Sequence, residues 1–153
     1  LGMGFTLAAA LAALGEDAQV TVAELVPEVE VWNQGPLGSA AGNPLNDPRA
    51  RVHIGDVAEL LRNSDSEWDA ILLDVDNGPE GLTRKENDWI YSPEGIAAAQ
   101  RGLRPEGILA YWSAGQEHAF TERLRRAGFS VEAVTVRALR PGKGARHVIW
   151  LAW

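Results

Sequence analysis

The feature that most constrains the fold is a short apolar run that ends in carboxylates. Residues 70–73 read AILL, and the sequence DVDNGP follows at 74–79. A short apolar run bounded by turn residues is typical of a buried strand in a parallel sheet. Open α/β sheets bind ligands at the carboxyl ends of such strands. Carboxylates are costly to bury without a partner, so Asp74 and Asp76 indicate a site. The alternative is an Asp that caps the next turn or helix.

The composition is that of an ordinary soluble globular protein. The chain has 153 residues, of which 46% are hydrophobic and 23% are charged. These values are typical of a single domain with a substantial core. We therefore expect residues 1–153 to form one domain. The apolar segment at residues 1–14 is too short to span a membrane.

Charge and cysteine content narrow the class of function. The net charge of −7 makes the chain a poor candidate for nucleic acids and is compatible with a small cationic substrate. The absence of cysteine excludes disulfides and thiolate metal sites, and it fits a cytoplasmic enzyme. His53, His118 and His147 lie far apart in the sequence, without the paired spacing of metal ligands. We expect no metal, nucleic-acid or membrane partner.

A glycine motif and an acidic residue together indicate a nucleoside site. Gly2 and Gly4 precede a helical pattern at residues 5–14, where a backbone turn can approach a ligand closely. Glu24 ends a strand pattern at residues 19–25 and lies 20 residues beyond Gly4. This spacing is typical of an acidic residue that binds ribose hydroxyls. The alternatives are a turn without a ligand and a solvent-facing Glu.

Helical and strand patterns alternate along the rest of the chain, which predicts an α/β fold. The predicted helices cover residues 27–34, 57–62, 93–103 and 117–127, and the predicted strands cover residues 51–54, 70–73, 108–113, 129–136 and 146–153. The last two strands should pair antiparallel because no helix separates them. Residues 35–48 and 104–107 are predicted loops or turns. The charged loop at 80–89 directly follows the candidate site, so we expect it to act as a lid. Asp56 follows a strand, where it caps a helix or binds adenine.

Several segments of the sequence carry a family resemblance: 22–27 (VAELVP), 47–52 (DPRARV), 55–56 (GD), 68–74 (WDAILLD), 91–92 (YS) and 103–109 (LRPEGIL). With these segments the chain resembles the class I S-adenosylmethionine-dependent methyltransferase fold, and more closely the spermidine synthase family and its bacterial relatives. The resemblance implies a Rossmann-like, mostly parallel sheet with a C-terminal antiparallel hairpin. The sequence begins directly at the glycine motif, without an initiator methionine. We therefore expect an N-terminally truncated fragment that lacks the first strand.

The resemblance implies roles for the cofactor-binding positions. Gly2 and Gly4 would approach the methionine-derived part of the co-substrate, which is S-adenosylmethionine or its decarboxylated form. Glu24 would bind the ribose hydroxyls. Asp56 and the backbone of Val57 would recognise the adenine.

The resemblance also implies an amine site. Asp74 matches the family's catalytic aspartate, and Asp76, Asn77 and Tyr91 fall at substrate-binding positions. An alkylamine has a pKa near 10, so it must lose a proton before it attacks a sulfonium carbon. A carboxylate can orient the ammonium and accept that proton. Family members usually carry a second aspartate followed by proline where this chain has Asn77.

These observations predict a transferase that moves an aminopropyl group to a diamine. Methyl transfer is the first alternative, because the motif at residues 74–79 departs from the family pattern. A non-catalytic nucleoside-binding module is the second. An NAD-dependent dehydrogenase is disfavoured because the third glycine of the dinucleotide motif is absent. The oligomeric state stays open, with a homodimer as one alternative.

Overall fold

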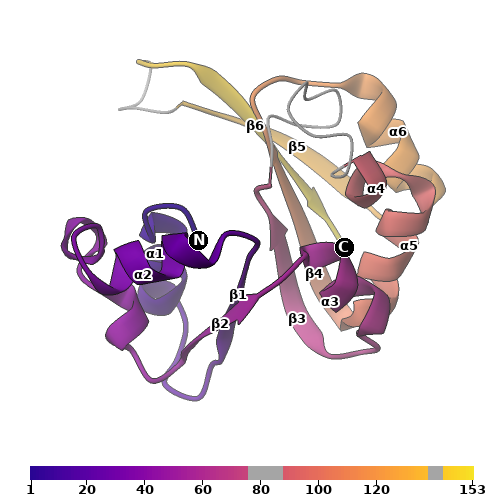
Figure 1. The fold of residues 1–153 in the computed structure, drawn as a ribbon. Helices are drawn as coiled ribbons and strands as arrows, with labels where there is room; N and C mark the ends of the chain where they lie inside the picture. Colours follow the sequence, from indigo (N-terminus) through magenta and orange to yellow (C-terminus); the bar gives the residue numbers. More distant parts are fainter. Residues whose placement is uncertain (76–87, 138–142) are drawn as a thin grey trace. The chain divides into compact units, whose positions relative to one another are not determined.

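The computed structural model describes residues 1–75, 88–137 and 143–153 (Figure 1). Contacts within the chain define two compact units, Leu1–Glu59 and Leu60–Trp153. The prediction of one domain stays a prediction. No helix in the described part of the chain is long and apolar enough to cross a bilayer.

The first unit is a two-stranded parallel sheet with helices before and between its strands. Strand β1 pairs with β2 from Val20 opposite Ala50 to Glu24 opposite Ile54. Helix α2 begins at a proline, which fits the first helical position because proline lacks the N–H that would have no intrahelical partner there. The predicted loop at residues 35–48 contains two short 3₁₀ helices. The elements are α1 (Phe5–Ala13), β1 (Val20–Glu24), α2 (Pro27–Gln34), η1 (Gly38–Ala41), η2 (Pro44–Asn46) and β2 (Ala50–Ile54), and α3 (Val57–Asn63) follows them.

The second unit is a four-stranded mixed sheet in the order β3-β4-β6-β5. Strands β3 and β4 are parallel, whereas β6 is antiparallel to both β4 and β5. The predicted C-terminal antiparallel pair is thus confirmed. Figure 1 shows α4, α5 and α6 on one face of this sheet. The elements are β3 (Trp68–Leu73), α4 (Asp88–Tyr91), α5 (Pro93–Gly102), β4 (Leu103–Ser113), α6 (His118–Arg126), β5 (Val131–Arg137) and β6 (Arg146–Ala152).

Strand β3 differs from its prediction as a strand buried on both faces. Ile71 and Leu73 are buried, but Leu72 is 60% exposed. Within the described residues β3 pairs with β4 alone, so it is an edge strand. Because side chains alternate between the faces of a strand, only one half of its apolar residues is buried.

The predicted turn at residues 104–107 is part of strand β4. The register passes from Trp68 opposite Leu103 to Ala70 opposite Ile108, so β4 contains an irregular insertion. Glu106 has a φ of 65° within this insertion. The turn was therefore predicted at the right residues, but it produces a bulge inside a strand instead of a break between elements.

Aromatic rings form the core of the second unit. Tyr91 contacts Tyr111 and Phe120, and Phe120 contacts Trp150 at a centroid distance of 5.0 Å. Tyr111, Phe120 and Trp150 are fully buried. The Tyr111 hydroxyl donates to the carbonyl oxygen of Ile90 at 3.0 Å, which ties α4 to the sheet.

Replacing Tyr111 by phenylalanine is expected to make the second unit less sensitive to alkaline pH. Burial raises the pKa of the Tyr111 phenol, and the neighbouring Tyr91 adds to the increase. The folded state therefore keeps this proton above pH 10, near which an unfolded tyrosine loses it, so stability falls as the pH rises further. Tyr111→Phe should cost about 1 kcal/mol at neutral pH and lose less stability above about pH 10. Urea unfolding of the variant and of the unaltered chain, at neutral pH and above about pH 10, measures this difference. Equal losses of stability in the two proteins at the higher pH would contradict the prediction.

Candidate functional site

The N-terminal glycine turn has the backbone conformation that requires glycine. Gly2 and Gly4 have φ values of 52° and 80°, which lie in the left-handed region that other residues rarely adopt. Gly4 is the N-cap residue of α1, and its amide donates to the carbonyl oxygen of Leu1 at 2.9 Å. A Cβ atom on Gly4 would lie 3.1 Å from Oδ1 of Asn33. The turn is thus tightly packed and begins a helix, as the sequence predicts.

Glu24 lies beside the glycine turn at the end of β1. Its Oε1 accepts a hydrogen bond from the amide of Val26 at 2.9 Å, and its Oε2 accepts one from the amino nitrogen of Leu1 at 3.1 Å. Partial burial acts to raise the pKa of Glu24, but hydrogen bonds, among them those from the Val26 amide and the Gly2 backbone, lower the pKa below its ordinary value. The structure therefore brings Glu24 to the glycine turn as an ionised acceptor.

Asp56 lies at the neighbouring strand end. The amide of Gly55 donates to the carbonyl oxygen of Glu24 at 2.9 Å, and this bond joins the ends of β1 and β2. Oδ1 of Asp56 accepts from the amide of Ala58 at 2.8 Å, so the carboxylate caps the first turn of α3, where Val57 lies. The capping interpretation is confirmed, and recognition of adenine by Asp56 and Val57 stays a prediction.

The residues predicted to form the amine site belong to the second unit or lie outside the described residues. Asp74 directly follows β3 and is exposed, which places it at a strand end as predicted. Asp76, Asn77 and most of the predicted lid lie outside the described residues. Tyr91 is only 2% exposed, and its carbonyl oxygen accepts from Nη1 of Arg123 at 2.8 Å. The structure thus places Tyr91 in the core, and substrate binding by this residue stays a prediction.

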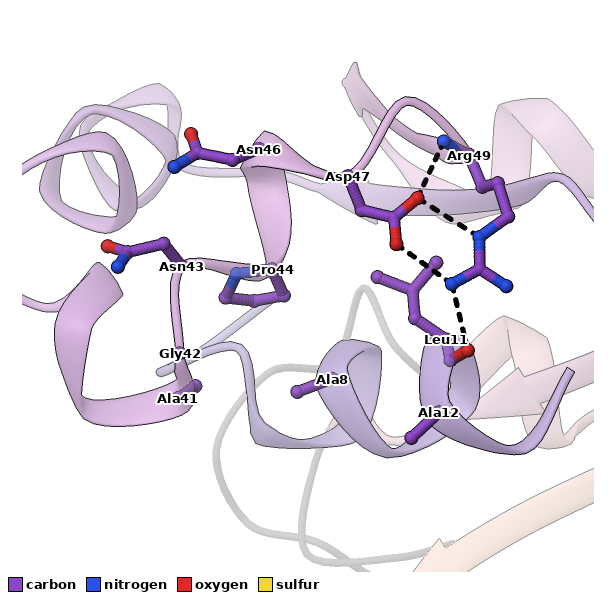
Figure 2. Close-up of a pocket in the computed structure, with 10 residues that line it drawn as sticks. All are labelled: Ala8, Leu11, Ala12, Ala41, Gly42, Asn43, Pro44, Asn46, Asp47 and Arg49. Carbon is purple, nitrogen blue, oxygen red and sulfur yellow. Dashed lines mark hydrogen bonds and ion pairs between the residues drawn. The ribbon is translucent and has the colours of Figure 1, made fainter. Parts of the chain in front are cut away.

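An open pocket of about 490 Å³ lies between α1 and the segment that leads into β2 (Figure 2). Arg49 on its wall donates to Asp47 and to the carbonyl oxygens of Leu11, Leu14 and Gly15, so it caps the end of α1. The hydrogen bonds from Arg49 lower the pKa of Asp47 to about 2. Because Arg49 and Asp47 pair with each other, neither of them leaves an unpaired charge on the wall of the pocket. The lining residues are Ala8, Leu11, Ala12, Ala41, Gly42, Asn43, Pro44, Asn46, Asp47 and Arg49, and none of them was predicted to bind the co-substrate.

Asn33 was missed by the sequence analysis. It is 2% exposed, and its Nδ2 donates to the carbonyl oxygen of Gly2 at 2.8 Å. An asparagine on a short helix usually lies at the surface, so no local pattern indicated that Asn33 would be buried against Gly2. Within the described residues, no group of three or more His, Asp and Glu residues could hold a metal ion.

No protein-family model matches the sequence, and no curated protein matches it. Solved structures do match this chain. A spermidine synthase from Thermotoga maritima aligns with 99% of this chain at a TM-score of 0.74 and 19% identity, and the alignment covers 50% of that protein. A spermidine synthase in complex with the transition-state analogue AdoDATO gives a TM-score of 0.71 at 19% identity, with 99% and 49% of the two chains covered.

A methyltransferase provides a third comparison. The 1,6-didemethyltoxoflavin-N1-methyltransferase from Burkholderia thailandensis, which has S-adenosylhomocysteine bound, aligns at a TM-score of 0.55 and 24% identity, with 88% of this chain and 60% of that one covered. The chain spans about half the length of the spermidine synthases it matches. It has the Rossmann-like α/β fold that spermidine synthases share with S-adenosylmethionine-dependent methyltransferases.

Proposed function

We propose that this chain binds S-adenosylmethionine or its decarboxylated form and transfers an aminopropyl group to a diamine. One observation carries the proposal: the glycine turn, Glu24 and Asp56 meet at two neighbouring strand ends in the first unit. The fold supports it, because spermidine synthases and methyltransferases have this fold. A small cationic amine as the partner, a homodimer and a cytoplasmic location stay predictions.

The first unit supplies the groups that would bind the nucleoside. The Glu24 carboxylate is ionised and can accept two hydrogen bonds from a ribose diol, one at each oxygen. The amide of Val57 belongs to the first turn of α3, where backbone N–H groups have no acceptor within the helix. That amide and Asp56 together offer one donor and one acceptor, which is the pair that an adenine edge requires.

Asp74 would act on the amine. Its carboxylate is exposed, so it can hold an ammonium group that approaches from solvent. When the amine attacks the carbon next to sulfur, a C–N bond forms and the C–S bond breaks. The ammonium first gives one proton to Asp74 or to water, so that the nitrogen lone pair can form the C–N bond. The electrons of the C–S bond then remain on sulfur, which becomes a neutral thioether. Because the sulfonium is already a good leaving group, orientation of the amine should supply much of the rate.

Methyl transfer is the second candidate, and the motif at residues 74–79 favours it because Asn77 replaces the second aspartate of the family pattern. Isothermal titration of the full chain with both sulfonium compounds separates the two. Tighter binding of decarboxylated S-adenosylmethionine supports aminopropyl transfer. Tighter binding of S-adenosylmethionine would contradict it and support methyl transfer.

Replacing Glu24 by glutamine is expected to weaken co-substrate binding by about 10- to 100-fold, because a hydrogen bond to a charged group contributes about 1.5–3 kcal/mol. The measurement is the dissociation constant of the tighter-binding sulfonium compound, obtained by titration calorimetry.

Glu16→Gln is the matched control. Glu16 is an exposed residue of the same unit, and its replacement makes the same charge change. The control should bind the ligand as the unaltered chain does. An unchanged dissociation constant in Glu24→Gln would mean that Glu24 does not contact the ribose.

A further inference from the structure

The side chain of Asn33 is a buried amide that the proposed roles do not use. It lies near the end of α2 and is 2% exposed. Its Nδ2 donates to two carbonyl oxygens, that of Val29 at 2.9 Å within its own helix and that of Gly2 at 2.8 Å. Its Oδ1 has no hydrogen-bond partner among the described residues. Such an unpaired buried acceptor is uncommon and destabilising.

An ordinary packing role does not explain this arrangement. A leucine at the same position would have a similar branched shape without an unpaired oxygen, so packing alone favours an apolar residue. What asparagine provides, and leucine does not, is the donor to Gly2. This bond joins residues that are 31 positions apart in the sequence, and it fixes one peptide group of the glycine turn to α2.

The hydrogen bond from Asn33 fixes the direction of the Gly2 carbonyl and also that of the neighbouring Met3 amide. The peptide group between Gly2 and Met3 is planar and trans, so its C=O and N–H point in opposite directions. Because Asn33 holds the carbonyl oxygen toward α2, the amide N–H of Met3 points away from α2. Gly2 itself is conformationally permissive at its φ of 52°, so without the bond this peptide could rotate more freely.

We infer that Asn33 is a positioning residue that orients the Gly2–Met3 peptide toward the sulfur-bound tail of the co-substrate. This inference rests on the proposed function, in which the glycine turn approaches the methionine-derived part of the ligand. Asn33 itself does not touch the ligand. Replacing Asn33 should therefore weaken the binding of ligands that have the tail and leave the binding of ligands without the tail unchanged.

The test compares two ligands by titration calorimetry on the full chain. One is S-adenosylmethionine, whose tail has a carboxylate that can accept a hydrogen bond from the Met3 amide, and the other is 5′-methylthioadenosine, which keeps the nucleoside and has only a methyl group on sulfur. For Asn33→Leu we expect the dissociation constant of the sulfonium compound to rise about tenfold, with that of methylthioadenosine changed less than about twofold. A general loss of structure would weaken both ligands equally.

Asn33→Asp provides a second variant of nearly the same shape, in which the donor to Gly2 is replaced by an acceptor. It should show the same selective loss. Gln34→Leu is the control, since Gln34 is the next residue of α2, is exposed and donates from its side chain to Oε1 of Glu30 at 3.1 Å. This variant should bind both ligands as the unaltered chain does.

The outcomes separate the inference from the proposed function. If the unaltered chain binds neither ligand, the proposed function is wrong and the inference falls with it. If it binds both and the ratio of the two dissociation constants is unchanged in the Asn33 variants, only the inference is overturned. If neither variant shows a cooperative thermal transition, Asn33 is needed for folding, which also overturns the positioning role.

Discussion

Replacing Asp74 by asparagine is expected to lower the turnover of aminopropyl transfer by about 10²- to 10⁴-fold, which is the usual contribution of a general base. The asparagine would keep the shape of the side chain and lose both its charge and its ability to accept a proton. The amine substrate is protonated at neutral pH because its pKa lies near 10. Without Asp74 the site would lose both the charge that attracts the ammonium and the carboxylate that can accept its proton.

The pH dependence of the variant provides a second readout. When the pH approaches the pKa of the amine, a growing fraction of the substrate arrives already deprotonated. The activity of Asp74→Asn should therefore rise with pH more steeply than that of the unaltered chain, and the difference between them should narrow. Binding of the sulfonium compound should stay the same, because the residues proposed to bind it are in the first unit.

Asp65→Asn serves as the matched control, since Asp65 is an exposed aspartate in the loop before β3. Turnover is measured from the rate at which the thioether product forms with a set of diamines. If Asp74→Asn retains full turnover, Asp74 is not the catalytic group. If the unaltered chain binds the sulfonium compound but shows no turnover with any amine, a non-catalytic nucleoside-binding module becomes the better interpretation.

The parts of the fold that the sequence predicts well are those that local patterns determine. Helix α2 has the predicted bounds, because Pro27 favours a helix start and Gly35 favours an end. The end of β1 at Glu24 was predicted because polar and apolar residues alternate up to that point. These elements position the glycine turn, Glu24 and Asp56, so this part of the candidate site could be anticipated.

The parts that were not predicted depend on contacts between distant residues. The bulge in β4 is accompanied by an ion pair between Arg104 and Asp69, whose Nη1 and Oδ2 atoms are 2.6 Å apart. These residues are 35 positions apart, and no local pattern indicates their contact. Asn33 is a similar case, because its bond to Gly2 depends on how α2 packs against the start of the chain. Tyr91 was predicted to bind substrate because residues 91–92 are one of the family markers. Its position in the aromatic core depends on rings from other elements.

The largest expected effect on stability is at Trp150. Its side chain is fully buried on β6, which lies between β4 and β5 in the sheet. Its ring packs edge-on against Phe120, and its Nε1 donates to the hydroxyl of Thr121 at 2.8 Å. Trp150 thus joins a central strand of the second unit to helix α6 by both packing and a buried hydrogen bond.

Trp150→Ala should destabilise the second unit by about 3–5 kcal/mol, which is typical of removing a large aromatic side chain from a core. The variant leaves a cavity and also leaves the Thr121 hydroxyl without its indole partner. Because small domains have a free energy of unfolding of about 5–15 kcal/mol, the loss would remove much of the stability. Urea unfolding, followed by circular dichroism, measures the change.

Two further variants show which part of the effect comes from packing. Trp153→Ala is the control, because this neighbouring tryptophan is 54% exposed and its loss should cost about 0.5 kcal/mol or less. Trp150→Phe keeps an aromatic ring against Phe120 and loses the donor to Thr121, so it should fall between the other two. A loss below about 1 kcal/mol in Trp150→Ala would mean that the sheet and α6 are held together by other contacts. Equal losses in Trp150→Ala and Trp150→Phe would mean that the buried hydrogen bond, and not the ring packing, makes the main contribution.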